Sequence, residues 1–184
     1  MQSKLAFLPI LAVVFLAVYG QSLPNLTSIL QSTPEASAFN ELVLGKQELL
    51  KTLEDWPTDL TILAPSNGAF DEMMNSMNTS SQPSVPMVGA SFDTIAGIVS
   101  YHVLNGTFYS TTFDSGETTV AWTLLQNNSY ANLHNSSQVV LGRKQDGGVF
   151  FYGGLDYSGK ADQVDIKFNK GVIHLIDQWV IYYH

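Results

Sequence analysis

Two of the four histidines, His102 and His174, lie among apolar residues, where an imidazole could act as a general base or bind a metal ion. Asp177 follows His174 by three positions, and a histidine next to a carboxylate is the usual pairing for general-base catalysis. In a strand over 171–181, however, side chains alternate between two faces, so residues three apart point in opposite directions. We therefore expect no pair between His174 and Asp177, and we interpret His174 as a core histidine that is hydrogen-bonded to the backbone.

The other residues capable of chemistry form no recognisable site. The histidines lack the i, i+2 or i, i+4 spacing of metal-binding pairs, and the chain has no cysteine. There is no Gly-x-Ser-x-Gly motif, and GLDYSGK over 154–160 is not a phosphate-binding loop because Ala161 follows its lysine. Carboxylates are plentiful, but no spacing selects a catalytic pair. We expect no catalytic residue, metal or cofactor, and a secreted hydrolase that uses carboxylates stays open as an alternative.

The first 20 residues have the layout of a secretory signal peptide. Lys4 precedes an apolar run over 5–18, and small residues then lead to Gly20 as a cleavage point. A membrane anchor is the alternative, but the run is short for a membrane span and contains Pro9. We expect residues 1–20 to be removed and residues 21–184 to form one domain, secreted and extracellular or associated with the cell surface.

Five Asn-x-Ser/Thr sequons without proline agree with an extracellular location. They lie at Asn25, Asn78, Asn105, Asn127 and Asn135. One sequon arises easily by chance, whereas five in a chain of 184 residues with an apolar leader support one another. The sequence therefore predicts a glycoprotein with N-linked glycans on several exposed loops.

The charge of the chain excludes one class of partner. It has 8 Lys and Arg residues against 16 Asp and Glu residues, which gives a formal net charge of −8. An acidic surface repels phosphate backbones and no basic cluster offsets it, so we expect no nucleic-acid partner. The C-terminal QWVIYYH is too short for a lipid-anchor signal, so we expect no membrane anchor in the mature chain.

Secondary-structure signals change from helical to β along the chain. Apolar residues at helical spacing predict helices over 32–45, 46–56, 91–104 and from near Gly68, whose cap is Ser66 or Asn67. Short β-branched and aromatic runs predict strands over 60–64, 118–125, 137–144, 147–154, 163–168 and 171–181. A surface loop is expected over 75–90, with a linker between domains as the alternative, and Gly171 is expected at a positive φ. Helices followed by strands indicate an α+β fold.

Three stretches in this order resemble the boxes of fasciclin (FAS1) domains. TILAPSNGAF over 61–70 is similar to the first box, YHVLNG over 101–106 to the Tyr-His segment, and DIKFNKGVIHLIDQWV over 165–180 to the second box. The resemblance covers roughly 23–182. It implies a FAS1-like, wedge-shaped β-sandwich of about seven strands with several helices packed on one side, and short secreted single-domain forms of the family occur, including in fungi.

The resemblance also implies a function. It points to a secreted, non-enzymatic glycoprotein module for cell adhesion or for contact with extracellular matrix or cell wall. Its partners would be extracellular proteins or surface polysaccharides, and the chain could also associate with itself. Tyr101 and His102 match the family's Tyr-His segment, and Asp165 and Ile166 match its Asp-Ile pair, which makes these four residues candidates for partner binding. The alternative is that they stabilise the fold.

A second hypothesis is a carrier or sensor of a small apolar ligand. A helix layer on a splayed sandwich could leave a cleft lined by aromatic side chains. The candidates are Trp122, Phe150, Phe151 and Tyr152. The alternative interpretation places these side chains in the core or on ordinary strand faces.

Overall fold

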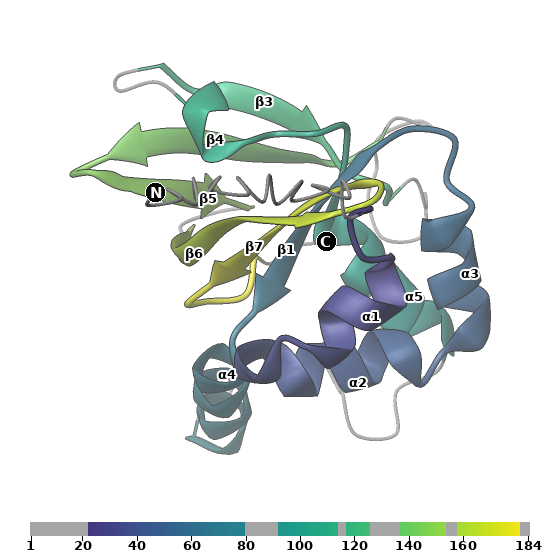
Figure 1. Ribbon diagram of the computed structural model, residues 1–184. Coiled ribbons are helices and arrows are strands. Elements are labelled where there is room, and N and C mark those ends of the chain that lie inside the picture. Colours follow the sequence, from purple (N-terminus) through teal and green to yellow (C-terminus); the bar gives the residue numbers. More distant parts are fainter. Residues whose placement is uncertain (1–21, 80–91, 114–116, 126–136, 154–157, 181–184) are drawn as a thin grey trace, which may run out of the picture.

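The computed structural model describes residues 22–79, 92–113, 117–125, 137–153 and 158–180 (Figure 1). Helices dominate the first part of the chain and strands the second, as the sequence predicts. The α-helices are α1 (Leu26–Gln31), α2 (Ser37–Leu44), α3 (Gln47–Glu54), α4 (Asn67–Thr79) and α5 (Phe92–Tyr101), with short 3-10 helices η1 (Pro34–Ala36) and η2 (Ser110–Thr112). The strands are β1 (Leu60–Pro65), β2 (Val103–Asn105), β3 (Thr119–Trp122), β4 (Val139–Gln145), β5 (Gly148–Tyr152), β6 (Ser158–Phe168) and β7 (Gly171–Ile176).

The strands form one seven-stranded sheet in the order β2-β1-β7-β6-β5-β4-β3. Among the strands of the described residues, β1 and β7 alone are parallel, and every other neighbouring pair is antiparallel. A bridge between Leu104 and Thr123 links the two ends of this order, so the sheet curls into an almost closed wedge. Figure 1 shows the helices gathered on one side of the wedge and β3 to β5 on the other. The expected α+β architecture is confirmed.

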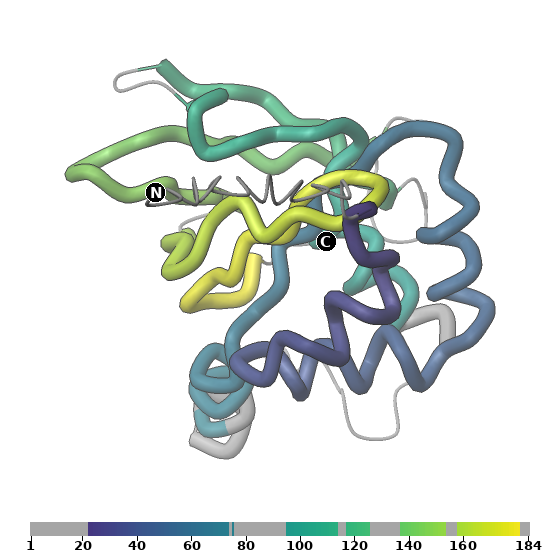
Figure 2. Tube along the Cα trace, viewed as in Figure 1, coloured from purple at the N-terminus to yellow at the C-terminus, as the bar shows by residue number. Residues whose placement is uncertain are grey.

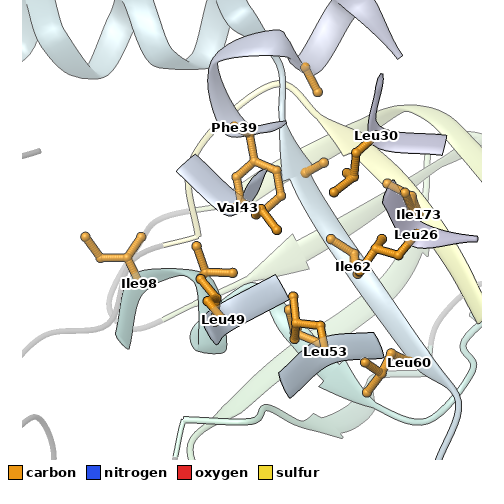
Figure 3. Close-up of a cluster of buried hydrophobic side chains, with 14 of the residues drawn as sticks. Leu26, Leu30, Phe39, Val43, Leu49, Leu53, Leu60, Ile62, Ile98 and Ile173 are labelled. Carbon is orange, nitrogen blue, oxygen red and sulfur yellow. The ribbon is translucent and has the colours of Figure 1, made fainter. Parts of the chain in front are cut away.

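Two cores lie on opposite faces of β1 and β7. The first, which we call the helix-side core, joins α1, α2, α3 and α5 to the sheet through side chains that include Leu30, Phe39, Ile62 and Ile173 (Figure 3). The second, the sheet-side core, fills the wedge and includes Leu63, Phe151 and Ile176. Alternation along each strand separates the two sets, because neighbouring residues of a strand point to opposite faces.

The turn between β6 and β7 requires glycine at position 171. Gly171 has φ +140°, as the sequence predicts, and a Cβ there would lie 1.8 Å from the carbonyl oxygen of Leu60. The Lys170 ammonium donates to the carbonyl oxygens of Glu54 and Trp56 at the end of α3, where a positive charge is favourable. The Asn169 amide donates to the Pro24 carbonyl at 2.8 Å, and Figure 2 shows the start of the helical segment beside this turn.

The junction between β1 and α4 ties two helices together. Ser66 is the N-cap of α4, since its hydroxyl oxygen accepts the Ala69 N–H at 3.2 Å. Asn67 points away from its own helix: its Oδ1 accepts the Ala38 N–H at 3.1 Å, and its Nδ2 donates to the Pro34 carbonyl at 3.0 Å. The Asn67 side chain therefore satisfies an otherwise unpaired N–H in the first turn of α2.

Two expected elements end earlier than predicted. The helix expected over 91–104 stops at Tyr101, because Val103 and Leu104 pair with β1 as strand β2. The strand expected over 171–181 stops at Ile176, because Asp177 turns to the neighbouring strand, where its Oδ1 accepts the Lys160 N–H at 2.7 Å.

Other boundaries also differ from expectation. Helix α4 runs to Thr79, so residues 75–79 are helical, while the rest of the loop expected over 75–90 lies outside the described residues. Helix α1 was not predicted, although Asn25 caps it and Leu26 and Leu30 form its buried side. Strand β6 begins at Ser158, five residues before the run that predicted it.

Candidate functional site

His102 lies at the end of α5 and is 1% exposed. Its Nε2 accepts the Val180 amide N–H at 3.3 Å, so this nitrogen carries no proton. Its Nδ1 therefore holds the proton and donates it to the Ile98 carbonyl at 2.9 Å. The Trp179 ring stands edge-on to the imidazole, with 4.9 Å between the centroids. Both ring nitrogens are thus used by backbone groups.

His174 has the opposite tautomer in strand β7 and is 0% exposed. Its Nδ1 accepts the Asp165 amide N–H at 3.3 Å, and its Nε2 donates to the Phe108 carbonyl at 2.8 Å. The ring packs beside Phe151 in the sheet-side core, with the centroids 5.6 Å apart. This histidine holds β6, β7 and the segment after β2 together.

Burial makes both imidazoles poor bases. Desolvation lowers the pKa of His102 from 6.5 to about 4, although the hydrogen bond to Ile98 opposes this. Burial also lowers the pKa of His174, against the raising effects of the Phe108 carbonyl and the Asp165 charge. Each ring is neutral at pH 7. Protonation would add a proton to the ring nitrogen that accepts a hydrogen bond, and this proton would face a backbone N–H, which has no lone pair to accept it.

Asp165 occupies an irregular part of β6, where the pairing with β7 shifts between Gln163 and Ile166. Its φ is +60°, a conformation that aspartate tolerates better than most residues. Its carboxylate accepts two hydrogen bonds from Ser110, from the amide at 2.8 Å and from the hydroxyl at 2.6 Å. The carboxylate therefore holds η2 against β6.

Ser110, Asp165 and His174 lie together but do not form a catalytic triad. In a triad the imidazole accepts the serine proton and the carboxylate orients the imidazole. Here the Ser110 proton goes to the carboxylate, and His174 meets the amide of Asp165 instead of its carboxylate. The arrangement cross-links three segments and activates no nucleophile.

One row across the sheet connects the three motif segments, 61–70, 101–106 and 165–180. The Leu63 amide donates to the His102 carbonyl at 2.8 Å, Leu63 is paired with His174, and His174 accepts the Asp165 amide. Tyr101, which is also buried, donates from its hydroxyl to the Val139 carbonyl at 3.2 Å. Ile166 is half-buried against the helix-side core. The partner-binding role of these residues stays a prediction, and Tyr101 and His102 present almost no surface to a partner.

The sequons divide into those that the structure places and those that it does not. Asn25 is exposed, and its Oδ1 caps α1 by accepting the Ser28 N–H at 2.9 Å. Asn105 is exposed at the end of β2, and its Oδ1 accepts the Thr58 hydroxyl at 2.7 Å. Asn78 lies in the last turn of α4, but its side chain, like Asn127 and Asn135, is outside the described part of the chain.

The four aromatic residues proposed to line a cleft do not share one surface. Phe151 is fully buried in the sheet-side core. Phe150 and Tyr152 point to the outer face of β5 and are half-buried, and Trp122 is 53% exposed on β3. In the sequence, Val120 and Trp122 alternate with the small residue Ala121, which is a signal that the two large side chains share one face of the strand. Whether that face is exposed depends on which strands lie beside it, and this pattern does not show them.

Two negative findings concern the residues with described positions. Within them, no group of three or more His, Cys, Asp or Glu side chains is arranged to hold a metal ion. None of the described helices has both the length and the apolar character needed to cross a bilayer.

Comparisons with known proteins agree with the fold. Residues 34–182 match the family described as the Fasciclin domain. The Fasciclin-like arabinogalactan protein elcF of Phaeosphaeria nodorum is 28% identical over 162 residues, which cover 87% of this chain and 48% of that protein. The FAS1 domain pair of the insect cell adhesion molecule Fasciclin I superimposes with a TM-score of 0.58 at 18% identity, over 81% of this chain and 46% of the other. The chain thus spans about half the length of the relatives it matches.

Proposed function

The chain belongs to the fasciclin domain family, and from this premise we propose that it is a secreted, non-enzymatic glycoprotein module for adhesion or for contact with cell wall or matrix. In this proposal residues 1–20 are a leader and residues 21–184 are the mature domain. Its partners are extracellular proteins or surface polysaccharides. The related arabinogalactan protein and the insect adhesion molecule support this choice by their descriptions.

The observation that carries the proposal is the use of both buried imidazoles by backbone groups. Each ring donates one hydrogen bond to a carbonyl and accepts one from an amide. No ring nitrogen is left to take a proton from a substrate or to bind a metal. His102 and His174, which sequence patterns singled out for chemistry, therefore stabilise the fold. In this proposal the protein acts by binding partners through its surface.

We place the motif residues in an indirect role. His174 and Asp165 hold the segment 108–110 against β6, and His102 holds residues after β7 against α5. Substitutions at these positions would then weaken partner binding through the shape of the nearby surface. Asp165 and Ile166 are both half-buried, so they are the two of the four candidates whose side chains a partner could touch without opening the core.

The test uses the mature glycoprotein secreted from a eukaryotic host. We expect it to sediment with cells, with wall or matrix polymers, or with immobilised copies of itself, and to do so without turnover of any of them. Secretion with a new N-terminus at residue 21 would support the leader. Absence of binding in all three assays, with and without enzymatic removal of glycans, would contradict the proposed function.

A further inference from the structure

The outer face of β3, β4 and β5 carries a strip of apolar and aromatic side chains. Strand register aligns Trp122 with Val139 and Val120 with Leu141 and Tyr152. Farther along, Arg143, Phe150 and Lys160 form one row across three strands. We call these residues the outer tract: Val120, Trp122, Val139, Leu141, Arg143, Phe150, Tyr152 and Lys160.

The outer tract is exposed at its β3 end. Trp122 is 53% and Val120 52% exposed, and both come from a strand of four residues. The helix-side core draws its strand residues from β1, β2, β6 and β7, so the helices pack away from this face (Figure 1). Exposed apolar patches of this kind mark interaction sites more often than single exposed residues do.

The aromatic rings of β5 lie along the sheet. The Tyr152 hydroxyl reaches Oε1 of Gln145 at 3.4 Å, although Tyr152 is paired with Leu141, four residues earlier in β4. The Phe150 ring leans over Gly148, with its Cε2 3.4 Å from the position that a Cβ there would occupy. A ring that lies along the sheet turns one face to the sheet and the other outward, and both residues are half-buried.

Polar groups border these rings. Lys160 is exposed beside Phe150, and its Cε lies 3.1 Å from the same Cβ position of Gly148. The buried Nε of Arg143 has no hydrogen-bond partner within the described chain. By strand spacing, Trp122 and Phe150 are separated by roughly 17 Å, which is long enough for more than one sugar ring.

Flat aromatic faces with donors beside them match the chemistry of a polysaccharide. The faces of a sugar ring carry C–H groups with slight positive charge, which stack on the negative face of an aromatic ring. Hydroxyl groups around the sugar's edge accept hydrogen bonds from Arg and Lys side chains. A protein partner would instead favour pockets for buried anchor residues, and flat rings offer none.

Charge selects among polysaccharides. The chain has a formal net charge of −8, which repels an anionic polymer and also a second copy of the chain. The positive charges of Arg143 and Lys160 in the outer tract are balanced by two nearby aspartates, Asp162 in β6 and Asp146 in the turn after β4. We propose that the outer tract binds a neutral polysaccharide through stacking on Trp122, Phe150 and Tyr152. This inference rests on the proposed function and names its partner class.

The experiment is affinity electrophoresis of the full glycoprotein in native gels that contain laminarin, hydroxyethylcellulose or polygalacturonate. We expect laminarin or hydroxyethylcellulose to retard the wild-type protein, and Trp122→Ala and Tyr152→Ala each to weaken this at least tenfold. Leu23→Ala is the control, because Leu23 is an exposed apolar residue that lies before α1 and outside the outer tract. Unchanged far-ultraviolet circular dichroism and an unchanged thermal midpoint would show that each variant is folded.

Three results would overturn the inference: no retardation by either neutral glucan, retardation by polygalacturonate alone, or equal losses in Leu23→Ala and Trp122→Ala. Self-association that Trp122→Ala abolishes would show that the outer tract binds a second copy of the chain, and this result would also overturn the inference. If the wild-type protein binds wall material and Trp122→Ala leaves this unchanged, the tract is wrong while the proposed function stands. If the wild-type protein binds no cell, polymer or copy of itself, the proposed function itself fails.

Discussion

His174 and Asp165 are joined through the amide of Asp165, which donates to the imidazole Nδ1 at 3.3 Å, while the Asp165 carboxylate is held by Ser110. A histidine, an aspartate and a serine thus meet without forming a proton relay. The same groups instead cross-link β6, β7 and η2. This relationship explains why residues that suggest chemistry in the sequence give a scaffold in the structure.

Replacement of His174 by alanine should destabilise the domain by about 3 kcal/mol, because it leaves a cavity and two backbone groups without partners. Urea denaturation followed by circular dichroism measures this. His174→Gln, which keeps a donor and an acceptor, should cost less than half as much. Equal stability of His174→Ala and the wild-type protein would show that the two hydrogen bonds do not support the fold.

Stability should fall as the pH drops from 6.5 toward 4. The folded-state pKa of His102 is lowered from 6.5 to about 4, so the unfolded chain binds more protons between these values. The contribution is fully present above pH 6.5, is lost as the pH falls to the folded-state pKa, and amounts to about 3 kcal/mol by 1.36 kcal/mol per pKa unit.

The His102→Gln variant isolates the histidine's share of this pH dependence. Its unfolding free energy should change less between pH 7 and pH 4 than that of the wild-type protein, by an amount close to the histidine contribution. Thermal unfolding at both pH values measures the difference. Parallel pH profiles of the two proteins would rule out a buried neutral His102.

Gly171→Ala should destabilise the domain by more than about 3 kcal/mol, because its φ of +140° and the Leu60 oxygen 1.8 Å away exclude a Cβ. Gly147→Ala is the matched control, since Gly147 also has a positive φ, +77°, but has no atom within 4 Å of a Cβ. It should cost about 1–2 kcal/mol. Chemical denaturation compares them, and equal costs would contradict the close approach to Leu60.

Asp165→Asn should be milder than Asp165→Ala. Asparagine tolerates the positive φ and still accepts a hydrogen bond from Ser110, whereas alanine does neither. We expect losses of about 1 and 2–3 kcal/mol in the free energy of unfolding. If partner binding falls to zero in Asp165→Asn while stability is retained, the carboxylate contacts a partner directly and the indirect role is wrong.

Glycosylation offers a test of the extracellular placement. Asn25 and Asn105 are exposed, so both should carry glycans in the secreted protein. Asn105→Gln should lower the intact mass by one glycan and leave the thermal midpoint nearly unchanged. A full-length mass that equals the unmodified mature chain would contradict these assignments.

Patterns local to a strand or turn predicted the structure well. Alternation along β7 predicted that Ile173 and Leu175 share one face and that Ile176 lies on the other, and the structure places the first two on the helix side. The Asn-Lys-Gly sequence predicted the positive φ of Gly171. Ends of elements were harder, because strand β2 exists only through its pairing with β1, and Asp177 leaves β7 to bind Lys160.

The arrangement of the candidate site depends on pairing between distant segments. The row from His102 through Leu63 and His174 to Asp165 joins four parts of the chain, and no local pattern encodes its order. The outer tract likewise follows from the register of β3, β4 and β5. A sequence reveals which residues share a strand face, but only the fold reveals which faces lie side by side.

Both buried imidazoles are neutral structural groups with opposite tautomers, and their role in the scaffold rests on this. Long-range ¹H–¹⁵N correlation NMR of the imidazole nitrogens measures this directly. We expect a proton on Nδ1 of His102 and on Nε2 of His174 at pH 7, with His102 titrating only near pH 4 and neither resonance shifting when Zn²⁺ is added. A charged imidazole at pH 7, the same tautomer in both rings, or a Zn²⁺-dependent shift would contradict it.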